Sequence, residues 1–350
     1  MPLTNVDLEY LAMIRDSTES ILRAAIGDSL DVAILDAPNQ TNVGDSLIWA
    51  GEIAYLRRMG LRLRYVSDIR TFDAAKLRKV MPEGVVLLHG GGNFGDLWLG
   101  HQNHREDVVA SLTDYRIVQL PQSIFFGSPE RAEKADAIIG AHSDFRLLLR
   151  DPLSIERAKE LLPSIDTTFC YDMALGYEPP VQRSPGPRDS VLIIARQDRE
   201  AVSGLSAVKD GWVPGVTCTS TDWHSEGWLA VKFRLARSAM RLQQRLVRVR
   251  RRLKFVPALP QRVDQRLIAT LNDINVVGAL RLYSTAGVIV VDRLHAHVLA
   301  LLLGIDHVAL DNNYRKIGAV FDEYTGKFST ARYATDTDMA RGFVEELTAR

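Results

Sequence analysis

Short, continuous apolar runs recur along this chain, and segments of helical length separate them. Examples are DVAILDAP at residues 31–38, GVVLL at residues 84–88 and GVIVV at residues 287–291. Runs this short and this apolar are typical of strands that are buried on both faces, as strands in parallel sheets are. Because such runs alternate with helical segments at βα spacing, the sequence predicts an α/β fold built on parallel sheets.

The pattern divides into two units. Residues 176–190, GYEPPVQRSPGPRDS, are rich in Pro, Gly and Arg and indicate a linker, after which the alternation restarts at SVLIIAR. A chain of 350 residues is long enough for two domains, each with its own core. We therefore predict an N-terminal α/β domain over residues 1–180 and a C-terminal α/β domain over residues 187–350. The expected architecture is two Rossmann-like domains that face a cleft.

Three further segments refine this pattern. We interpret residues 115–127, YRIVQLPQSIFFG, as a strand that Pro121 closes. Residues 218–228, CTSTDWHSEGW, are expected to be irregular, and a long helix is expected over residues 227–253. The second unit then continues with a strand at GVIVV, a helix and a strand at HVALD.

Charge and cysteine content exclude several classes of protein. Lys and Arg number 43, as do Asp and Glu, so no polyanionic partner such as nucleic acid is indicated. Cys170 and Cys218 are too few for a disulfide framework or a zinc site and fit a reducing compartment, and we identify no metal-ligand set. The N-terminus lacks a secretory pattern, and the longest apolar run, AHVLALLLGI, is far short of the roughly 20 residues that span a bilayer. We expect a cytoplasmic protein without a transmembrane anchor.

The most biased segment is RLQQRLVRVRRRLK at residues 241–254, which holds seven cations. Leu242, Leu246, Val249 and Leu253 follow a helical period within it, so a basic amphipathic helix is predicted. One interpretation is a solvated helix face near the domain junction. The alternative is peripheral contact with the anionic inner face of a membrane. The aromatic residues that favour binding of single-stranded nucleic acid do not interleave with these cations.

The first polar cluster is NVGDSLI at residues 42–48, where a predicted strand gives way to a helix. Gly44 permits a tight turn there, and Asp45 or Ser46 is suited to cap the helix. Free amides at a helix N-terminus also bind anions or hydroxyl-rich ligands. Asn42 and Asp45 are therefore candidates either for capping alone or for ligand binding.

The second cluster is HGGGNFGDLW at residues 89–98. Consecutive glycines let the backbone approach another group closely. The segment has neither the Gly-Lys-Ser/Thr of a Walker motif nor the spacing of a dinucleotide-binding loop. It indicates either a tight strand-to-helix crossover or a ligand-binding loop, whose candidate residues are Gly91, Gly92, Asn93 and Asp96.

The third cluster is cationic and follows the strand-like runs of the second unit. Its members are Arg196, Asp292, Arg293, His295, Asn312 and Lys316. Arg196 ends the run SVLIIAR, the DRLH stretch follows GVIVV, and Lys316 lies beyond the next predicted strand. Because successive βα loops of a parallel sheet lie side by side, we expect these groups to meet at one edge of the cleft.

These residue types suit the binding of a small, multiply charged anion. Arg293 can clamp a carboxylate or a phosphate with two parallel hydrogen bonds. His295 can transfer a proton near neutral pH, and Asp292 can orient either the imidazole or Arg293. Taken singly, Arg196 fits a surface salt bridge and His295 fits a capping or core histidine. We interpret His297, which should point elsewhere on the helix, as structural.

These motifs, in this order, resemble a known family. NVGDSLI, GGGNFGD, R-x-D-x-E at residues 196–200, TDW at residues 221–223, DRLHAHVLALLLGI and DNNYRKI are similar to motifs of the polysaccharide pyruvyl transferases. The resemblance covers roughly residues 30–325 and implies a fold like the two-domain GT-B glycosyltransferases. One departure is Tyr171, which stands where proline is expected before Asp172.

The resemblance implies transfer of an enolpyruvyl group from phosphoenolpyruvate to a sugar of an exopolysaccharide, a cell-wall polymer or a lipid-linked oligosaccharide precursor. The product would be a cyclic pyruvate ketal, with phosphoenolpyruvate as co-substrate and no further cofactor. The family's donor-binding residues would fall on Arg196, Arg293, His295 and Lys316. We hypothesise that Asn312 joins them, and that the catalytic residues are His295, Arg293 and Asp292.

The acceptor sugar is expected on the side of the first domain. Its proposed contacts are Asn42, Asp45, Gly91, Gly92, Asn93 and Asp96. Two other functions stay open on the sequence alone. One is a GT-B glycosyltransferase that uses a nucleotide sugar, and the other is a non-catalytic sugar- or membrane-binding scaffold.

Overall fold

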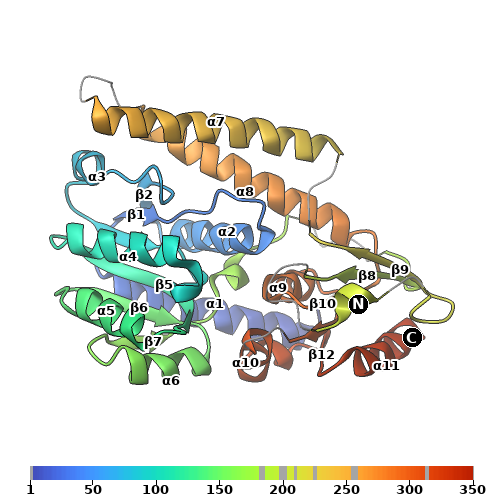
Figure 1. Ribbon diagram of the computed structural model, residues 1–350. Coiled ribbons are helices and arrows are strands. Elements are labelled where there is room, and N and C mark those ends of the chain that lie inside the picture. Colours follow the sequence, from blue (N-terminus) through green and yellow to red (C-terminus); the bar gives the residue numbers. More distant parts are fainter. Residues whose placement is uncertain are drawn as a thin grey trace.

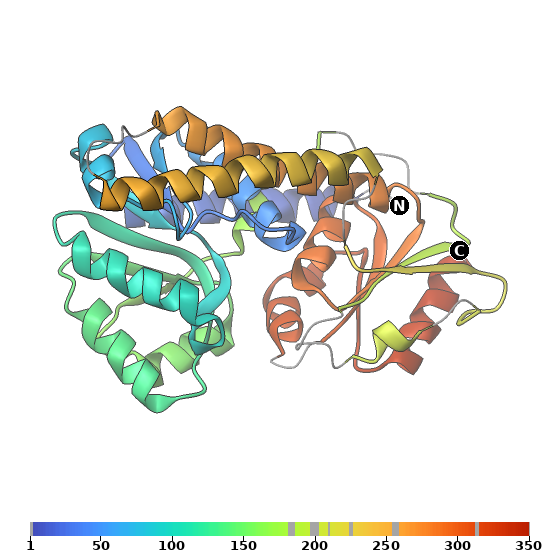
Figure 2. The same ribbon diagram turned by 45° about the horizontal axis from the view of Figure 1, so that its top comes forward.

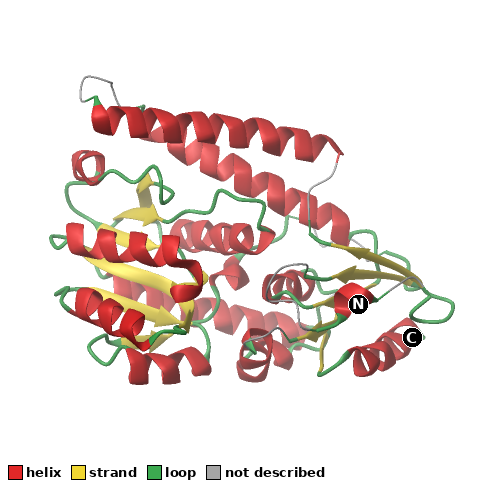
Figure 3. Cartoon of the chain, viewed as in Figure 1, coloured by secondary structure: helices red, strands yellow, loops and turns green. Residues whose placement is uncertain are grey.

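The computed structural model describes residues 3–180, 186–196, 203–208, 211–223, 227–253, 259–311 and 315–349. Two parallel sheets lie side by side, each covered by helices (Figures 1 and 3). This arrangement confirms the predicted α/β fold with two Rossmann-like units.

The first sheet uses strands from the first half of the chain. They are β1 (Asp31–Leu35), β2 (Arg62–Val66), β3 (Val85–Leu88), β4 (Gly91–Gly95), β5 (Arg116–Phe125), β6 (Phe145–Leu149) and β7 (Thr167–Phe169). The order is β2-β1-β3-β5-β6-β7, and β4 pairs with β5. Because the order reverses between β1 and β3, the loops after these two strands flank a topological switch point, where doubly wound sheets bind ligands.

The second sheet has the same kind of reversal. Its strands are β8 (Ser190–Ile194), β9 (Thr217–Thr221), β10 (Val288–Val291), β11 (Asp306–Leu310) and β12 (Ala331–Ala334). The order is β12-β11-β10-β8-β9, so the switch point lies between β8 and β10. Arg196 follows β8 and His295 follows β10, which brings two candidates of the cationic cluster to this point.

The helices complete both units. Those of the first half are α1 (Asn5–Ile26), α2 (Val43–Arg58), α3 (Ala74–Val80), α4 (Leu99–Ser111), α5 (Pro129–Gly140) and α6 (Pro152–Leu161). Those of the second half are α7 (Gly227–Arg252), α8 (Gln261–Tyr283), α9 (Leu294–Leu302), α10 (Lys316–Glu323) and α11 (Thr337–Thr348). Short 3-10 helices are η1 (Asp96–Trp98), η2 (Met173–Gly176), η3 (Leu205–Ala207) and η4 (Thr325–Lys327).

The strand β5 corrects one prediction, because it continues through Pro121 to Phe125. Before the proline, β5 pairs with β3, and beyond it β5 pairs with β4. The pairing with β6 also shifts register between Gln119 and Gln122. Pro121, which has no N–H to donate, therefore occupies the irregular position where β5 changes partner.

Two further segments differ from the prediction. Residues Thr217–Thr221 form the strand β9 next to β8, although we expected this segment to be irregular. Only Cys218 of this strand is buried, so the apolar run that marks the other strands is missing. The glycine-rich stretch after β3 is not a simple turn but the short strand β4.

Two helices connect the units. At the start of α1, Asp7 accepts hydrogen bonds from the backbone and the hydroxyl of Ser329, while Arg15 donates to carbonyls near η2. The helix α8 lies across the first unit, where Lys76 and Asp264 form a buried ion pair of 2.7 Å. Figure 2 shows α7 and α8 running above both lobes. The division near residue 180 thus stays a prediction about domains, because chain from each half packs on the other.

No helix among the described residues is both long enough and apolar enough to cross a membrane.

Candidate active site

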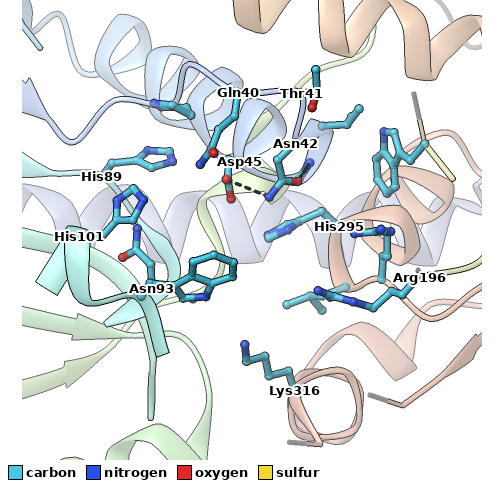
Figure 4. Close-up of a pocket in the computed structure, with 18 of the residues that line it drawn as sticks. Gln40, Thr41, Asn42, Asp45, His89, Asn93, His101, Arg196, His295 and Lys316 are labelled. Carbon is cyan, nitrogen blue, oxygen red and sulfur yellow. Dashed lines mark hydrogen bonds between the residues drawn. The ribbon is translucent and has the colours of Figure 1, made fainter. Parts of the chain in front are cut away.

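A cavity of about 440 Å³ lies between the carboxyl ends of the two sheets. Residues of both units line it, as Figure 4 shows. The first unit contributes Asp36, Pro38, Gln40, Thr41, Asn42, Val43, Gly44, Asp45, His89, Gly92, Asn93, Trp98, His101 and Arg150. The second contributes Arg196, Asp222, Trp223, Arg293, Leu294, His295 and Lys316.

His295 lies in the first turn of α9, and groups of the other unit hold its ring. Its Nε2 atom is 3.3 Å from Asp172 Oδ2 and 3.3 Å from Arg150 Nη1. Arg150 and Asp172 themselves form an ion pair of 2.6 Å with almost no solvent exposure. The predicted proton-transfer residue thus belongs to a three-residue network that spans the interface between the units.

The carboxylate of Asp172 stays ionised in this network. Burial alone would raise its pKa, but the charges of Arg150 and His295, with their hydrogen bonds, hold the pKa well below its usual range. The ionised Asp172 places a negative charge 3.3 Å from Nε2 of the His295 imidazole. This arrangement gives His295 a fixed orientation and a compensating charge, which are the requirements of a general acid or base.

Asp292 has a different role from the one expected. Its buried carboxylate accepts hydrogen bonds from the backbone N–H of Arg196 and the hydroxyl of Ser203. Asp172, rather than Asp292, contacts the imidazole of His295. Burial raises the pKa of Asp292 above its ordinary value. Asp292 therefore fixes the chain where Arg196 enters the site, and it does not line the cavity.

Arg293 and Arg196 line the second unit's side of the cavity. The guanidinium of Arg293 donates to Asp222 at 2.7 Å, in the segment between β9 and α7. This bond holds Arg293 beside His295, its near neighbour at the start of α9. The structure thus brings these two cations and the histidine together, as the sequence predicted.

Lys316 reaches the cavity from the start of α10 and approaches Arg150 of the first unit. A Cβ atom placed on Gly92 would lie 3.2 Å from Arg150 Nη2 and 3.6 Å from Lys316 Nζ. Asp311 fixes the start of α10 by accepting hydrogen bonds from the backbone of Ile317 and Gly318. Gly92 thus leaves room for two cations from opposite units.

The cluster around Asn42 forms the opposite wall. Asn42 caps α2 by accepting from the backbone N–H of Gly44, and it also donates to Asp45 at 2.9 Å. The cap is therefore Asn42, rather than Asp45 or Ser46. Gly44 is helical and makes no turn, but a Cβ on it would lie 2.7 Å from His295 Nδ1. Because Gly44 has no side chain, α2 can approach His295 closely.

The glycine-rich cluster contributes only in part. Gly92 and Asn93 line the cavity, and Asn93 is held by Gln122 and Arg105. Asp96 does not line it, because its carboxylate accepts from the backbone N–H groups of Gly127 and Ser128. Gly91 lies in β4 outside the lining. Of the predicted acceptor contacts, Asp96 and Gly91 thus lie outside the lining of this cavity.

Several lining residues were missed by the sequence analysis. They are Arg150, Asp36, His89, Trp98 and His101. Arg150 and Asp36 directly follow buried strands, so the reasoning that selected Arg196 would have found them. Asp36 also has a positive φ of 60°, a conformation that is uncommon outside glycine. His101 lies in α4, away from any strand end, and the sequence offers no comparable signal for it.

Asn312 lies outside the described residues. Within the described part of the chain, no group of three or more His, Cys, Asp or Glu side chains is arranged to hold a metal ion. His297 is fully buried and bonded to His307, which agrees with its structural interpretation.

A model of the family described as polysaccharide pyruvyl transferase matches residues 42–314, which is well over half of the chain. The chain belongs to the polysaccharide pyruvyl transferase family. The match begins at the Asn42 cluster and ends just before Lys316. In this pyruvyl transferase family member, the family region therefore includes most of the residues that line the cavity and the whole His295 network.

Individual relatives agree with this assignment. Pyruvyl transferase 1 of Schizosaccharomyces pombe is 26% identical over 295 residues, which cover 81% of this chain and 66% of that protein. EpsO of Bacillus subtilis, provisionally named a pyruvyl transferase, is 27% identical over 291 residues, which cover 82% of this chain and 83% of EpsO.

A crystal structure shares the fold of this pyruvyl transferase family member. It is that of a functionally uncharacterised protein from Klebsiella pneumoniae, with a TM-score of 0.52 and 16% identity. The alignment covers 95% of this chain and 100% of the other. At this identity the similarity concerns the two-unit fold alone.

Proposed function

We propose that this chain transfers an enolpyruvyl group from phosphoenolpyruvate to a sugar of an exopolysaccharide, a cell-wall polymer or a lipid-linked oligosaccharide precursor. The observation that carries the proposal is that cations from both units surround His295 in one cavity. Family membership supports the reaction class. It also favours this function over the nucleotide-sugar glycosyltransferase.

The proposed donor is small and carries two anionic groups. Arginine binds carboxylates and phosphates through two parallel hydrogen bonds, and lysine acts on them as a point charge. Arg293, Arg196 and Lys316 would hold the carboxylate and the phosphate, with Arg150 as an additional cation from the first unit. Asn312 remains a proposed donor ligand outside the described residues.

His295 would act as the general acid. Protonation of the donor's methylene carbon creates oxocarbenium character at the adjacent carbon, which a sugar hydroxyl then attacks. A second hydroxyl closes the ketal as phosphate leaves. The cations beside the phosphate stabilise the charge that develops on it. Asp172 would stabilise the protonated imidazole before the transfer, because it remains ionised within 3.3 Å of Nε2.

The acceptor would bind against the first unit. Asn42, Asp45, Gly92 and Asn93 line that wall, and their amide and carboxylate groups can hydrogen-bond to sugar hydroxyls. Trp98 is 52% exposed and lines the same cavity, so it offers a flat apolar surface to one face of a sugar ring. A sugar placed there would lie between this wall and the donor cations.

The outer face of α7 supports a membrane-associated acceptor. Large apolar side chains stand exposed at helical spacing along it: Trp228, Leu235, Leu242, Leu246 and Val249, followed by Leu253 just past the helix end. Exposed cations flank them, and residues 227–253 contain no Asp or Glu. We call these six apolar residues the α7 face. An apolar stripe between cations complements a surface of anionic lipid headgroups above acyl chains.

The opposite face of α7 is engaged with the protein. Phe233, Met240 and Val247 are buried, and Arg237 donates to Asn39 at 2.7 Å. The helix is therefore fixed with its α7 face outward. We propose that this face rests on an anionic membrane surface and keeps the enzyme near lipid-linked acceptors. Residue 254, the last of the predicted basic helix, lies outside the described residues.

Calorimetry tests the proposed donor. Phosphoenolpyruvate, UDP and UDP-glucose would be titrated into the wild type and into Arg293→Ala and Lys316→Ala variants. Arg341→Ala serves as the control, because its exposed side chain pairs with Glu345 within α11, outside the cavity lining. We expect phosphoenolpyruvate to bind the wild type and the control, and both site variants to lose this binding.

A second assay tests the reaction by measuring phosphate release from phosphoenolpyruvate with candidate sugar acceptors. Release that depends on the acceptor supports pyruvyl transfer. Turnover of UDP-glucose without phosphoenolpyruvate would replace the proposal with the glycosyltransferase alternative. A wild type that neither binds phosphoenolpyruvate nor releases phosphate with any acceptor would refute it.

A further inference from the structure

The first unit's wall of the cavity contains two histidines, and each is backed by a buried carboxylate. His101 Nδ1 lies 2.7 Å from Asp36 Oδ1, and His89 Nδ1 lies 2.9 Å from Glu52 Oε2. Asp36 is 5% exposed and Glu52 is fully buried. Figure 4 shows His89 and His101 on one side of the cavity, away from Arg196 and Lys316. Neither histidine belongs to the donor network around His295.

The geometry leaves the second ring nitrogen of each histidine for a ligand. In both, Nδ1 is committed to the carboxylate, so Nε2 is the remaining polar atom. His89 is only 3% exposed, and its Nε2 has no hydrogen-bond partner among the described residues, although the side chain lines the cavity. A buried ring nitrogen in this state is costly unless something that enters the cavity satisfies it.

His101 is the more accessible of the two. Its side chain keeps 22% of its surface exposed, so a sugar hydroxyl can reach it. Asp36 is held in turn by Asn93 Nδ2 at 3.3 Å, and it adopts its positive φ at the end of β1. Strained backbone of this kind is found where a side chain must be aimed at a site.

The proposed reaction needs a proton acceptor on this wall. Two hydroxyl hydrogens must leave the sugar diol. In the overall reaction, one of these protons is accounted for by the methylene carbon of the donor, which becomes a methyl group. The other leaves with the phosphate. His295 lies with the donor cations and supplies the first of these. A base beside the attacking hydroxyl has so far not been assigned.

We propose that His101, positioned by Asp36, is the general base that takes the proton of the attacking sugar hydroxyl, and that His89 binds the neighbouring hydroxyl through Nε2. This inference rests on the proposed function. As the hydroxyl oxygen bonds to the central carbon of the donor, its proton passes to His101 Nε2 while His295 protonates the methylene carbon. The second hydroxyl then attacks the same carbon, the bond to the phosphate oxygen breaks, and the second proton leaves with phosphate. Return of the proton from His101 to His295 through solvent resets both groups.

The charges around His101 make its imidazole more basic. Burial lowers the pKa of His101, but the hydrogen bond and charge of Asp36, with the charge of Asp45, outweigh it and raise the pKa. Arg105 opposes them, and His104 of the same helix lies near Asp36. The base form is the deprotonated one, so activity should rise with pH through the pKa of His101.

The test uses four variants and two readouts. His101→Gln, Asp36→Asn and His89→Gln are compared with Asn103→Ala, which changes an exposed residue of the same helix whose side chain bonds Arg131. Phosphate release is measured against pH with saturating phosphoenolpyruvate and methyl glycosides that carry adjacent hydroxyls. Calorimetry with phosphoenolpyruvate reports whether each variant still folds and binds the donor.

We expect His101→Gln to lower kcat by about 10²–10⁴-fold while the dissociation constant for phosphoenolpyruvate stays unchanged. Asp36→Asn should shift the rising limb of the pH profile to lower pH, because His101 loses the carboxylate that raises its pKa. His89→Gln should raise KM for the acceptor more than it lowers kcat. Asn103→Ala should behave as the wild type.

Three results would overturn the inference without touching the proposed function. In the first, the wild type is active and the His101→Gln variant has the same kcat and pH profile as the wild type. The second is a pH limb that Asp36→Asn does not move. The third is loss of phosphoenolpyruvate binding in His101→Gln, since the residue would then serve the donor side. A wild type without transfer activity would instead refute the proposed function itself.

Discussion

The imidazole Nε2 of His295 lies 3.3 Å from Asp172 Oδ2, although the two residues follow strands of different sheets. His295 follows β10 of the second sheet, and Asp172 follows β7 of the first. The candidate acid and its orienting carboxylate are therefore assembled only when the two units are correctly placed. Any change in their relative position is expected to alter proton transfer before it alters the cores of the sheets.

Neutralisation of Asp172 should separate catalysis from donor binding. In Asp172→Asn, the imidazole of His295 loses its compensating charge, while the cation of Arg150 is no longer paired. We expect kcat to fall by about 10²-fold or more, while phosphoenolpyruvate binds at least as tightly as before. Steady-state kinetics and calorimetry check both parts. Asp322→Asn, in an exposed pair with Arg315, is the control. A lower affinity for phosphoenolpyruvate with unchanged kcat would contradict this role.

Gly44→Ala should displace His295. The added Cβ would lie 2.7 Å from Nδ1 of the imidazole, which is closer than such atoms approach in proteins. We expect kcat to drop while the thermal unfolding temperature changes little, because the ring can rotate out of the way. Gly342→Ala, whose Cβ would meet nothing within 4 Å, should keep full activity. A fully active Gly44→Ala enzyme would show that the observed position of His295 is not required.

The α7 face should bind anionic vesicles. Binding to vesicles of phosphatidylglycerol and phosphatidylcholine, measured by sedimentation, should exceed binding to phosphatidylcholine alone and weaken as salt rises. Replacing Leu242 and Leu246 with serine should reduce it. The exposed Met339 of α11, replaced with serine, is the control.

Two outcomes would count against the membrane proposal. Equal binding to both kinds of vesicle would show that anionic headgroups do not contribute to the binding. The second outcome is a protein that does not bind vesicles but self-associates, and whose self-association the serine substitutions abolish. The α7 face would then bind a second copy of the chain.

A buried histidine pair should make the protein sensitive to mild acid. His297 Nδ1 and His307 Nε2 lie 2.8 Å apart with no solvent exposure. Burial lowers the pKa of His307 to about 4 and holds that of His297 well below its ordinary value. The unfolded chain therefore binds protons first as pH falls below about 6.5.

The free energy of unfolding should then decrease by up to about 1.4 kcal/mol per pH unit for each histidine as pH falls from about 6.5 toward 4. Urea unfolding at a series of pH values measures this slope. A His307→Asn variant should show a shallower slope over the same range. An identical slope in the variant would mean that other groups cause the loss of stability.

The sequence predicted the regular parts of the fold because buried parallel strands have a local signature. β3 and β10 are apolar throughout, and both were identified. β9 is an edge strand of Thr, Cys and Ser, so only its pairing with β8 makes it a strand. The helix α8 went unrecognised because it buries polar side chains such as Asn272 and Asn275, which bond to carbonyls near the cavity.

The same distinction between local and long-range signals applies to the candidate site. Arg293, His295 and Lys316 follow neighbouring strands of one sheet, so topology alone brings them together. Asp172 and Arg150 join them from the other sheet, and no local pattern reveals how two sheets face each other. The resemblance to the family supplied the chemistry, but the contact between His295 and Asp172 required the three-dimensional structure.

The bond between Asp7 and Ser329 has a consequence for how the chain is made. The two residues are 322 positions apart, and this bond, together with the one from the Tyr10 hydroxyl to the carbonyl of Tyr324, attaches the first helix to the second unit. During synthesis, the ribosome releases α1 long before Ser329 exists. The helix must therefore wait, with its buried side uncovered or resting on the first sheet alone, until nearly the whole chain has emerged. The contacts of α1 with the second unit are therefore among the last that the growing chain can form.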